Sequence, residues 1–419
     1  MAADPADHPS SEPLGAALLE SDLVFEQQVL RLNIRGDEFV YPFVAGPDCN
    51  VTSGFGLNVS NEFGLWKRAD LVHIGQLVRL TLIGRGADNA TLSLVDCEPT
   101  HQVDFDAGSE RCICLRWDQA ARLRCTVRLR VPTWPVLLQA EVVPQGARRV
   151  MGVCSLPIFP PVCNFEAADV ACIMCNVPQA RQCRALNGLM PLYVAEAPGY
   201  LGIGGKVWDA ALATIQWLSG PEECSKTSGS RLDQWVCGKH LLELGSGTGV
   251  LALTLGTLSS PLSVTMTDLL EVVPLLEMNL ALNRVVGSLR QADATRGGGF
   301  HCAPLRWGDA GDVQRLLASG IAHDTLLLSD LVYDPTCYAP LVDSLVALCP
   351  PELHGRQRAL LVYRHRHSAS TFFSMLEKYF EVDVLPGLDQ WAVDEALEGD
   401  SSMMDMQFFS CTRRPAAVA

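Results

Sequence analysis

The sequence predicts a β-rich N-terminal part followed by an α/β C-terminal part, and three observations lead to this. The chain has 419 residues, which is enough for two or three domains. Up to about residue 145, short apolar runs alternate in part at period two and are separated by Gly, Asn, Asp and Pro, as in strands. From Gly199 onward, strand-like and helix-like runs alternate, which predicts a mostly parallel sheet.

Composition and charge narrow the class of protein. Hydrophobic residues make up 48% of the chain and charged residues 19%, which excludes a mostly disordered chain. No segment approaches 18 uninterrupted apolar residues, so we expect no transmembrane helix. The net charge of −15 disfavours nonspecific binding to nucleic acid or to an anionic membrane, so we expect neither as a partner.

The start of the chain and its cysteines indicate a compartment. The first residues are acidic and contain Pro, without the features of a secretory signal or a transit peptide. Sixteen cysteines in such a chain are expected to be reduced thiols. We therefore expect a cytoplasmic location, with the nucleus as the alternative.

The N-terminal part contains no catalytic motif. We expect a disordered leader over 1–20 and a β-rich accessory domain over 21–150, either a small sandwich or a barrel. Residues 151–198 are rich in Cys and Pro and are interpreted as a linker with a hairpin. The hairpin turn is expected at Asn187-Gly188, because this pair favours a two-residue turn.

The C-terminal part, 199–419, is expected to contain seven strands with helices between most of them. The predicted strands are 240–244, 262–268, 299–307, 325–330, 359–364, 380–385 and 406–412. Helices are predicted over 206–217, over 250–258, in a run ending near Arg284, and over 312–318, 335–348 and 370–379. The last two strands have no helix between them, which indicates a terminal hairpin.

A glycine-rich segment is the strongest motif. Residues 241–249 read Leu-Leu-Glu-Leu-Gly-Ser-Gly-Thr-Gly, between a predicted strand and a predicted helix. Gly245, Gly247 and Gly249 permit a tight turn and a close approach of a ligand to the backbone. A dinucleotide fingerprint requires Gly or Ala where Val250 stands. Glu243 can instead receive a cationic amino group, which suits the methionine portion of S-adenosylmethionine.

Two further residues complete the expected cofactor site. Asp268 ends the second predicted strand, 19 residues after Gly249, where an acidic side chain can accept hydrogen bonds from ribose hydroxyls. The alternative for Asp268 is the N-cap of the next helix. Trp307, in the segment Leu305-Arg-Trp-Gly308, can pack against an adenine ring, and its alternative is ordinary core or edge packing.

The end of the fourth predicted strand offers substrate-side groups. Ser329-Asp330-Leu-Val-Tyr333 places a carboxylate and a phenol where ligands bind in open α/β sheets. Asp330 and Tyr333 could hold an attacking amine and help to remove its proton. The alternative is that Asp330 caps the next helix and Tyr333 packs.

Taken together, these motifs resemble a known family. Gly204-Gly-Lys-Val-Trp-Asp-Ala-Ala211, the glycine segment, Thr267-Asp268, Leu305-Arg-Trp-Gly308 and Asp330-Leu-Val-Tyr333 occur in this order. The set resembles the seven-β-strand protein-lysine methyltransferases of methyltransferase family 16. It looks most like the methyltransferase-like protein 21 group, which includes the lysine methyltransferases of valosin-containing protein and heat-shock proteins. The resemblance covers roughly 195–413 and implies a Rossmann-like sheet.

The resemblance also implies roles for individual residues. The expected contacts to S-adenosylmethionine come from Trp208, Glu243, Gly245, Ser246, Gly247, Gly249, Asp268, Trp307 and Ser329. Asp330 and Tyr333 match the acid-x-x-Tyr motif on the substrate side, and we expect them to be catalytic. The long N-terminal half departs from the group, so no substrate can be inherited from it.

The function expected from this combination is S-adenosylmethionine-dependent protein-lysine N-methylation of a cytosolic protein. A chaperone, an ATPase or a translation factor would fit as substrate, and we expect the enzyme to be a monomer. One alternative is a methyltransferase for a small amine or for histidine. Another is a non-catalytic binding module that retains the cofactor fold.

Three remaining features lie outside this set of motifs. Cys172 and Cys175 have zinc-knuckle spacing, but no second such pair accompanies them, so we expect no metal. An acidic loop over 389–405 could attract a basic target, although such runs are usually solvated. His365 and His367 follow the fifth predicted strand, on the edge where a substrate would bind.

Overall fold

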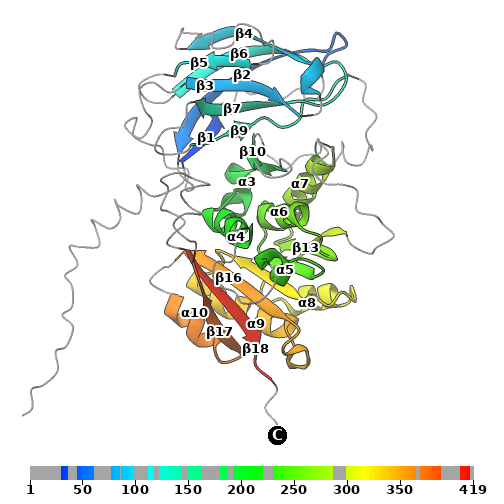
Figure 1. The fold of residues 1–419 in the computed structure, drawn as a ribbon, viewed down its shortest axis with the longest axis vertical. Coiled ribbons are helices and arrows are strands. Elements are labelled where there is room, and N and C mark those ends of the chain that lie inside the picture. The colour runs from blue at the N-terminus through cyan, green and yellow to red at the C-terminus, as the bar shows by residue number, and fades with distance from the viewer. Residues whose placement is uncertain are drawn as a thin grey trace, which may run out of the picture.

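The molecule consists of a β-rich domain and an α/β domain that lie end to end along its longest axis (Figure 1). The computed structural model describes residues 30–35, 45–60, 77–84, 86–98, 112–117, 122–143, 150–161, 173, 180, 182–186, 192–219, 230–285, 299–364, 369–387 and 406–415. Among these residues, no helix is both long enough and apolar enough to cross a membrane.

The β-rich domain is built from two sheets that share one core. The first sheet has the order β4 (Thr91–Glu98), β6 (Arg122–Arg130), β2 (Asn50–Ser60), β1 (Leu30–Arg35), β8 (Val150–Met151). The second has the order β11 (Leu192–Glu196), β10 (Gln182–Leu186), β9 (Val153–Cys154), β7 (Leu137–Val143), β3 (Leu77–Ile83), β5 (Cys112–Leu115). A short 3-10 helix, η2, spans Ala87–Asn89.

Period-two alternation explains the core of this domain. Along β6 the odd-numbered residues 123–129 are buried, while the arginines at both ends of the strand are exposed. Leu129 of the first sheet and Leu80 of the second are fully buried and belong to one hydrophobic cluster. Because successive side chains of a strand point to opposite faces, this pattern places one face of each sheet against the other.

The segment predicted as a linker with a hairpin supplies four strands. β10 and β11 form an antiparallel hairpin, with Gln182 opposite Glu196. The expected turn at Asn187-Gly188 lies outside the described residues. The segment does more than connect, because β8 pairs with β1 in the first sheet and β9 joins β7 and β10 in the second. Residues 150–196 therefore extend both sheets of the β-rich domain.

The α/β domain carries the seven-stranded sheet that the sequence predicts. Its strand order is β14 (Phe300–Pro304), β13 (Ser263–Asp268), β12 (His240–Leu244), β15 (Thr325–Ser329), β16 (Arg358–Arg364), β18 (Met406–Arg413), β17 (Phe380–Leu385). The first five of these strands pair in parallel, and β18 is antiparallel to both of its neighbours. This is a Rossmann-like sheet closed by the expected terminal hairpin.

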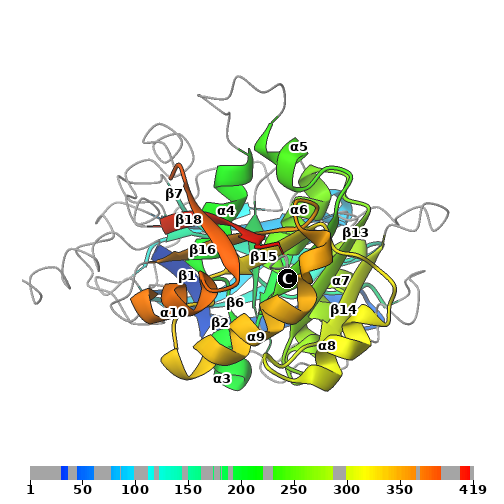
Figure 2. The ribbon, with the colours of Figure 1, turned by 90° about the horizontal axis from the view of Figure 1, so that it is seen from below.

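Helices cover both faces of this sheet (Figure 2). On one face, α4 (Asp209–Ser219), α5 (Arg231–Trp235), α6 (Val250–Leu258) and α7 (Val273–Val285) contribute to one hydrophobic cluster. On the other, α8 (Ala310–Leu317), α9 (Tyr338–Leu348) and α10 (Ala369–Leu376) contribute to a second cluster. The short elements are α3 (Pro198–Leu201), η3 (Gly202–Gly205), η5 (Pro335–Cys337) and η6 (Pro351–Leu353).

Helix α7 joins the two domains by covering the edge strand β11. The side-chain amide of Asn279 accepts a hydrogen bond from the Ala195 N–H at 2.7 Å and donates one to the Ala195 carbonyl at 3.2 Å. Asn283, one helical turn later, makes the same pair of bonds with Tyr193, at 2.9 and 2.6 Å. Both asparagines are fully buried, so they satisfy backbone groups that an edge strand otherwise leaves unpaired.

Candidate functional site

A cavity of about 850 Å³ opens at the carboxyl ends of β12, β13 and β15. β12 is flanked by β13 on one side and by β15 on the other, which is where the strand order reverses. Ligands of open α/β sheets bind at this position. Ten of the residues predicted for the site line the cavity, namely Trp208, Glu243, Gly245, Ser246, Gly247, Asp268, Trp307, Ser329, Asp330 and Tyr333.

The glycine turn between β12 and α6 forms the floor of the cavity. Gly245, Gly247 and Gly249 all have positive φ angles, of 58°, 55° and 75°. A Cβ on Gly245 would lie 2.7 Å from Leu331 Cδ2, so a side chain there would have to displace the cavity wall. The turn therefore requires glycine both for its backbone conformation and for the space that it leaves.

Gly249 is the one predicted site residue that does not line the cavity. It is the left-handed N-cap of α6, and a Cβ on it would lie 2.9 Å from Met266 Sδ and 3.0 Å from Leu276 Cδ2. The motif correctly located a glycine that the turn needs, but this glycine faces the hydrophobic core under the cavity.

Glu243 presents a carboxylate that the described residues leave incompletely bonded. The side chain is 3% exposed, lines the cavity, and its Oε2 has no hydrogen-bond partner among the described residues. Burial raises the pKa of Glu243 to about 8, opposed by a hydrogen bond from Ser246. A buried carboxylate with one unbonded oxygen is stabilised in its ionised form by a cationic ligand.

Asp268 is oriented by the same turn. Its Oδ2 accepts a hydrogen bond from the Gly247 N–H at 2.7 Å, and its Oδ1 accepts one from the Leu269 N–H at 2.7 Å. Burial raises the pKa of Asp268, and these two bonds oppose that rise. Helix α7 begins five residues later, at Val273, so Asp268 is not the N-cap of that helix. Each oxygen has lone-pair capacity left for a ligand hydroxyl.

Asp330 and Tyr333 lie where β15 ends. Asp330 adopts a φ of 56°, uncommon for a residue other than glycine, and donates its N–H to the Val362 carbonyl at 2.7 Å. The helix cap that follows is supplied by Asp334, whose side chain accepts the Thr336 N–H, and not by Asp330. Burial raises the pKa of Tyr333 to about 12, so its phenol is neutral near pH 7 and can donate a hydrogen bond.

Two hydroxyl groups add to the polar surface of the cavity. Ser329 Oγ and Thr248 Oγ1 are buried, and neither has a hydrogen-bond partner among the described residues. Buried polar atoms are nearly always bonded in folded proteins. With Glu243 Oε2, they indicate a polar ligand that completes the cavity.

The aromatic walls come from two separate segments. Trp208 donates its indole N–H to the Ile203 carbonyl at 2.8 Å, and Lys206 Nζ lies 4.8 Å from the centre of the Trp208 ring. Trp307 lies beside the glycine turn, since a Cβ on Gly245 would be 3.0 Å from Trp307 Cζ2. Trp307 also contacts the hydrophobic cluster under α8 and α9. It therefore packs against the core, as the alternative predicted, and lines the cavity as well.

Sequence reasoning missed a group of cavity residues between β11 and α4. Tyr200, Leu201 and Ile203 line the cavity, and Tyr200 and Ile203 are about half exposed. No motif marks them. One signal could have indicated them: they are large apolar residues in a Gly-rich segment without the periodicity of a helix or strand that packs on a core.

Several predicted features lie outside the described residues: the leader 1–20, the cysteines 172 and 175, the histidines 365 and 367, and the acidic loop 389–405. Within the described part of the chain, no group of three or more His, Cys, Asp or Glu side chains is arranged to hold a metal ion.

Comparisons with known proteins agree with the position of the cavity. A family model described as lysine methyltransferase matches residues 190–379, which contain every residue of the cavity. Residues 190–379 of this chain are therefore similar to lysine methyltransferases. EEF1A lysine methyltransferase 3 of Mus musculus is 29% identical over 185 residues, or 44% of this chain and 67% of the relative. Protein-lysine N-methyltransferase EFM6 of Saccharomyces cerevisiae is 28% identical over 209 residues, or 46% and 78%.

Solved structures overlap with this chain only in part. An O-methyltransferase family protein from Burkholderia thailandensis has a TM-score of 0.30 and 10% identity, covering 43% of this chain and 52% of that one. The chain thus spans about half the length of that protein. A precorrin-6y C5,15-methyltransferase from Geobacter metallireducens has a TM-score of 0.29 and 10% identity, covering 49% of this chain and 89% of that one.

The methyltransferase domain takes S-adenosylmethionine as its cofactor, and the residues of the cavity fit this molecule. The unpartnered Oε2 of Glu243 suits an ammonium group, and the oriented carboxylate of Asp268 suits a pair of hydroxyls. The volume of about 850 Å³ is typical of cofactor sites.

Proposed function

We propose that this chain transfers a methyl group from S-adenosylmethionine to a lysine side chain of a cytosolic protein. The observation that carries the proposal is that a single cavity contains two sets of groups. Glu243 and Asp268 suit the cofactor, while Asp330 and Tyr333 lie at the end of the adjacent strand β15. Because β12 lies between β13 and β15, the two sets of groups can hold a methyl donor and an acceptor amine side by side in one cavity.

On the cofactor side, each residue has a distinct task. Glu243 binds the amino group through Oε2, which no described residue bonds, and Asp268 accepts hydrogen bonds from the ribose hydroxyls. Trp307 provides an apolar wall for the adenine ring. When bound, S-adenosylmethionine supplies an activated methyl group, and the residues of this chain supply binding and orientation.

On the substrate side, the target amine has to lose a proton. A free lysine has a pKa of about 10.4, and only its neutral form has the lone pair that attacks. The Asp330 carboxylate can accept a hydrogen bond from the target ammonium and favour loss of the proton as the amine aligns. Tyr333 contributes its ring as a wall for a cationic group and its neutral phenol as a hydrogen-bonding partner.

The rim of the cavity supports a protein as the target over a small amine. Tyr200, Ile203, Leu269 and Tyr333 line the cavity and are also exposed, by 53%, 52%, 38% and 38%. The neighbouring Leu270 is 70% exposed. Large apolar side chains gathered around one opening are typical of a surface that contacts another protein. A small amine would leave most of this rim in water.

The names of two relatives suggest which protein to test first. The mouse relative is named for EEF1A, and the yeast relative is named as a protein-lysine N-methyltransferase. We therefore propose a translation factor as the first class of cytosolic substrate to examine. The β-rich domain has the size to select a different target, so a whole-lysate assay accompanies the test of EEF1A.

The test is transfer of radiolabelled methyl groups into purified EEF1A and into a cell lysate, followed by mass spectrometry of labelled bands. We expect label on lysine, a loss of about 100-fold in rate for Asp330→Asn, and a loss of about tenfold for Tyr333→Phe. Both variants should bind S-adenosylhomocysteine as the wild type does, because they lie on the acceptor side. Label on histidine or only on a small metabolite would contradict the proposal.

A further inference from the structure

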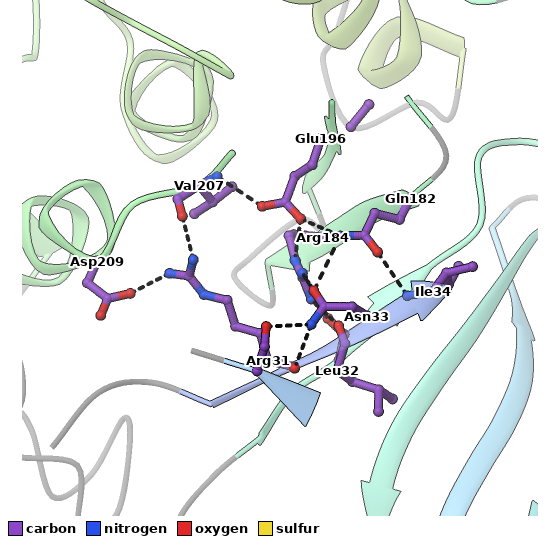
Figure 3. A network of polar contacts seen from close by, with 12 residues as sticks. Arg31, Leu32, Asn33, Ile34, Gln182, Arg184, Glu196, Val207 and Asp209 are labelled. Atoms are coloured by element: carbon purple, nitrogen blue, oxygen red, sulfur yellow. Dashed lines mark hydrogen bonds and ion pairs between the residues drawn. The ribbon is translucent and has the colours of Figure 1, made fainter. Parts of the chain in front are cut away.

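A buried polar network connects the β-rich domain to the segment that precedes α4 (Figure 3). It contains Arg31 of β1, Arg184 of β10 and Glu196 of β11, all 2% exposed or less. Arg31 reaches residues that are 176 and 178 positions away in the chain. The network therefore ties the first described strand of the chain to the entrance of the α/β domain.

The network fixes both peptide groups of Val207. The Val207 N–H donates to Glu196 Oε1 at 2.9 Å, and the Val207 carbonyl accepts from Arg31 Nη1 at 2.6 Å. Val207 lies between η3, which ends at Gly205, and α4, which begins at Asp209, so regular secondary structure does not set its position. Side chains of the β-rich domain set it instead.

The same arginine also holds the first residue of α4. Asp209 is fully buried and forms ion pairs with Arg31 and with Arg364, the latter at 3.4 Å. Because a buried carboxylate needs paired charges, loss of Arg31 would remove the closer of the ion pairs that Asp209 forms with Arg31 and Arg364. The start of α4 therefore depends on a residue of β1.

The residues on either side of Val207 line the cofactor cavity. Lys206 and Trp208 both face it, and the Lys206 ammonium lies over the Trp208 ring. The ring is aligned by its bond to the Ile203 carbonyl, within the same segment. A shift of Val207 would move both walls of the cavity together, since they are adjacent residues of one chain segment.

We propose that Arg31 is a positioning residue for the cofactor cavity, through which the β-rich domain sets the affinity for S-adenosylmethionine. Arg31 acts through Val207 and Asp209 on Trp208 and does not itself contact the cavity. The proposal rests on the proposed function, because it takes S-adenosylmethionine as the occupant. It gives the N-terminal half of the chain a role inside the methyltransferase site.

The test compares binding of S-adenosylhomocysteine to the full-length wild type and to Arg31→Met by calorimetry. Met retains much of the apolar stem and removes both hydrogen bonds. We expect the Kd to rise about tenfold, which is within the usual range of coupling between sites. The matched control is Arg79→Met, which removes an arginine of the same domain whose partner, Glu141, lies 2.7 Å away on the surface. Its Kd should stay within twofold of the wild type.

A double-mutant cycle separates positioning from general destabilisation. If Arg31 acts through Trp208, then Arg31→Met should change the Kd less than threefold in a Trp208→Ala background. An equal change in both backgrounds, or an unchanged Kd in the single variant, would overturn the proposal. Failure of the wild type itself to bind S-adenosylhomocysteine would instead contradict the proposed function.

A milder substitution covers the case in which Arg31→Met does not fold. Arg31→Lys keeps the positive charge beside Asp209 but cannot bond Val207 and Asp209 in the same planar arrangement. We expect an intermediate Kd, about threefold above the wild type, with little change in melting temperature. A Kd equal to that of the wild type would count against the positioning role.

Discussion

Glu196 and Glu243 are buried to the same degree, at 2% and 3% exposure, and each lies at the carboxyl end of a strand. Glu196 is fully engaged: Oε1 accepts the Val207 N–H, and Oε2 accepts from Arg184 and Gln182, both at 2.8 Å. Glu243 lies at the cavity with Oε2 unpartnered among the described residues. A buried glutamate thus has both oxygens hydrogen-bonded within the fold in one region, and one oxygen available to a ligand in the other.

Electrostatics separates the two carboxylates further. Burial acts to raise the pKa of Glu196, but Arg184, Arg31 and the Val207 N–H outweigh it and hold that pKa below its usual value. Burial raises the pKa of Glu243 to about 8, and no cation among the described residues opposes this rise. A buried acid that the protein pairs stabilises the fold, whereas one that it leaves unpaired is available to a ligand.

The largest expected effect is on cofactor binding, in Glu243→Gln. The substitution removes the only charge that we assign to the amino group of S-adenosylmethionine. We expect the Kd for S-adenosylhomocysteine to rise about a thousandfold, or about 4 kcal/mol, as for truncation of a buried charge pair. Calorimetry measures the affinity, and thermal unfolding without ligand should show no loss of stability. A Kd within tenfold of the wild type would contradict the assignment of Glu243.

The second effect is on stability, in Glu196→Gln. This substitution leaves Arg184 without its ionic partner in a site from which water is excluded. We expect a loss of about 3 kcal/mol in the free energy of unfolding, measured by denaturant titration. Arg79→Met, at an exposed ion pair, should cost less than about 1 kcal/mol and serves as the control. If Glu243→Gln destabilised the protein more than Glu196→Gln, the contrast between the two carboxylates would be lost.

Much of the sheet could be predicted because its strands are buried apolar runs with clear limits. The expected bounds of β12, α6 and β17 agree with the structure, and the terminal hairpin was found from the missing helix between its strands. Apart from Trp208, the predicted residues of the cavity lie at or just after strand ends, where motif spacing is informative. The extension of the second sheet by β9, β10 and β11 was not predicted, because the pairing of β9 with β7 joins segments that the sequence pattern does not link.

Helix α4 shows where the local pattern was insufficient. The apolar periodicity predicted a start at residue 206, but the helix begins at Asp209. The Val207 peptide is bonded to Arg31 and Glu196 instead of to a helical turn, and no local signal encodes a partner 176 residues away. Tyr200 and Ile203 were missed for the same reason, since tertiary contacts place their segment beside the cavity.

A third expected effect is a proton released on binding, which sharpens the contrast between the two carboxylates. With a pKa of about 8, Glu243 is mostly protonated at pH 7 in the free protein. Pairing with the amino group of the cofactor requires the ionised form, so binding should release close to one proton at pH 7. Calorimetric titrations in buffers of different ionisation enthalpy measure this number, and it should fall to near zero in Glu243→Gln.

The free energy of unfolding should depend on pH in opposite directions for the two glutamates. Between about pH 4.3, the usual pKa of Glu, and pH 8, the folded protein holds a proton on Glu243 that the unfolded chain lacks, so stability falls as pH rises. The slope is about 1.4 kcal/mol per pH unit for one full proton, and Glu243→Gln should remove it. Glu196, with its lowered pKa, contributes stability that is present above about pH 4.3 and is lost as pH falls below it. A stability profile that stays flat from pH 5 to 8 in the wild type would mean that Glu243 is already paired in the free protein, and the reason for assigning it to a cationic ligand would be gone.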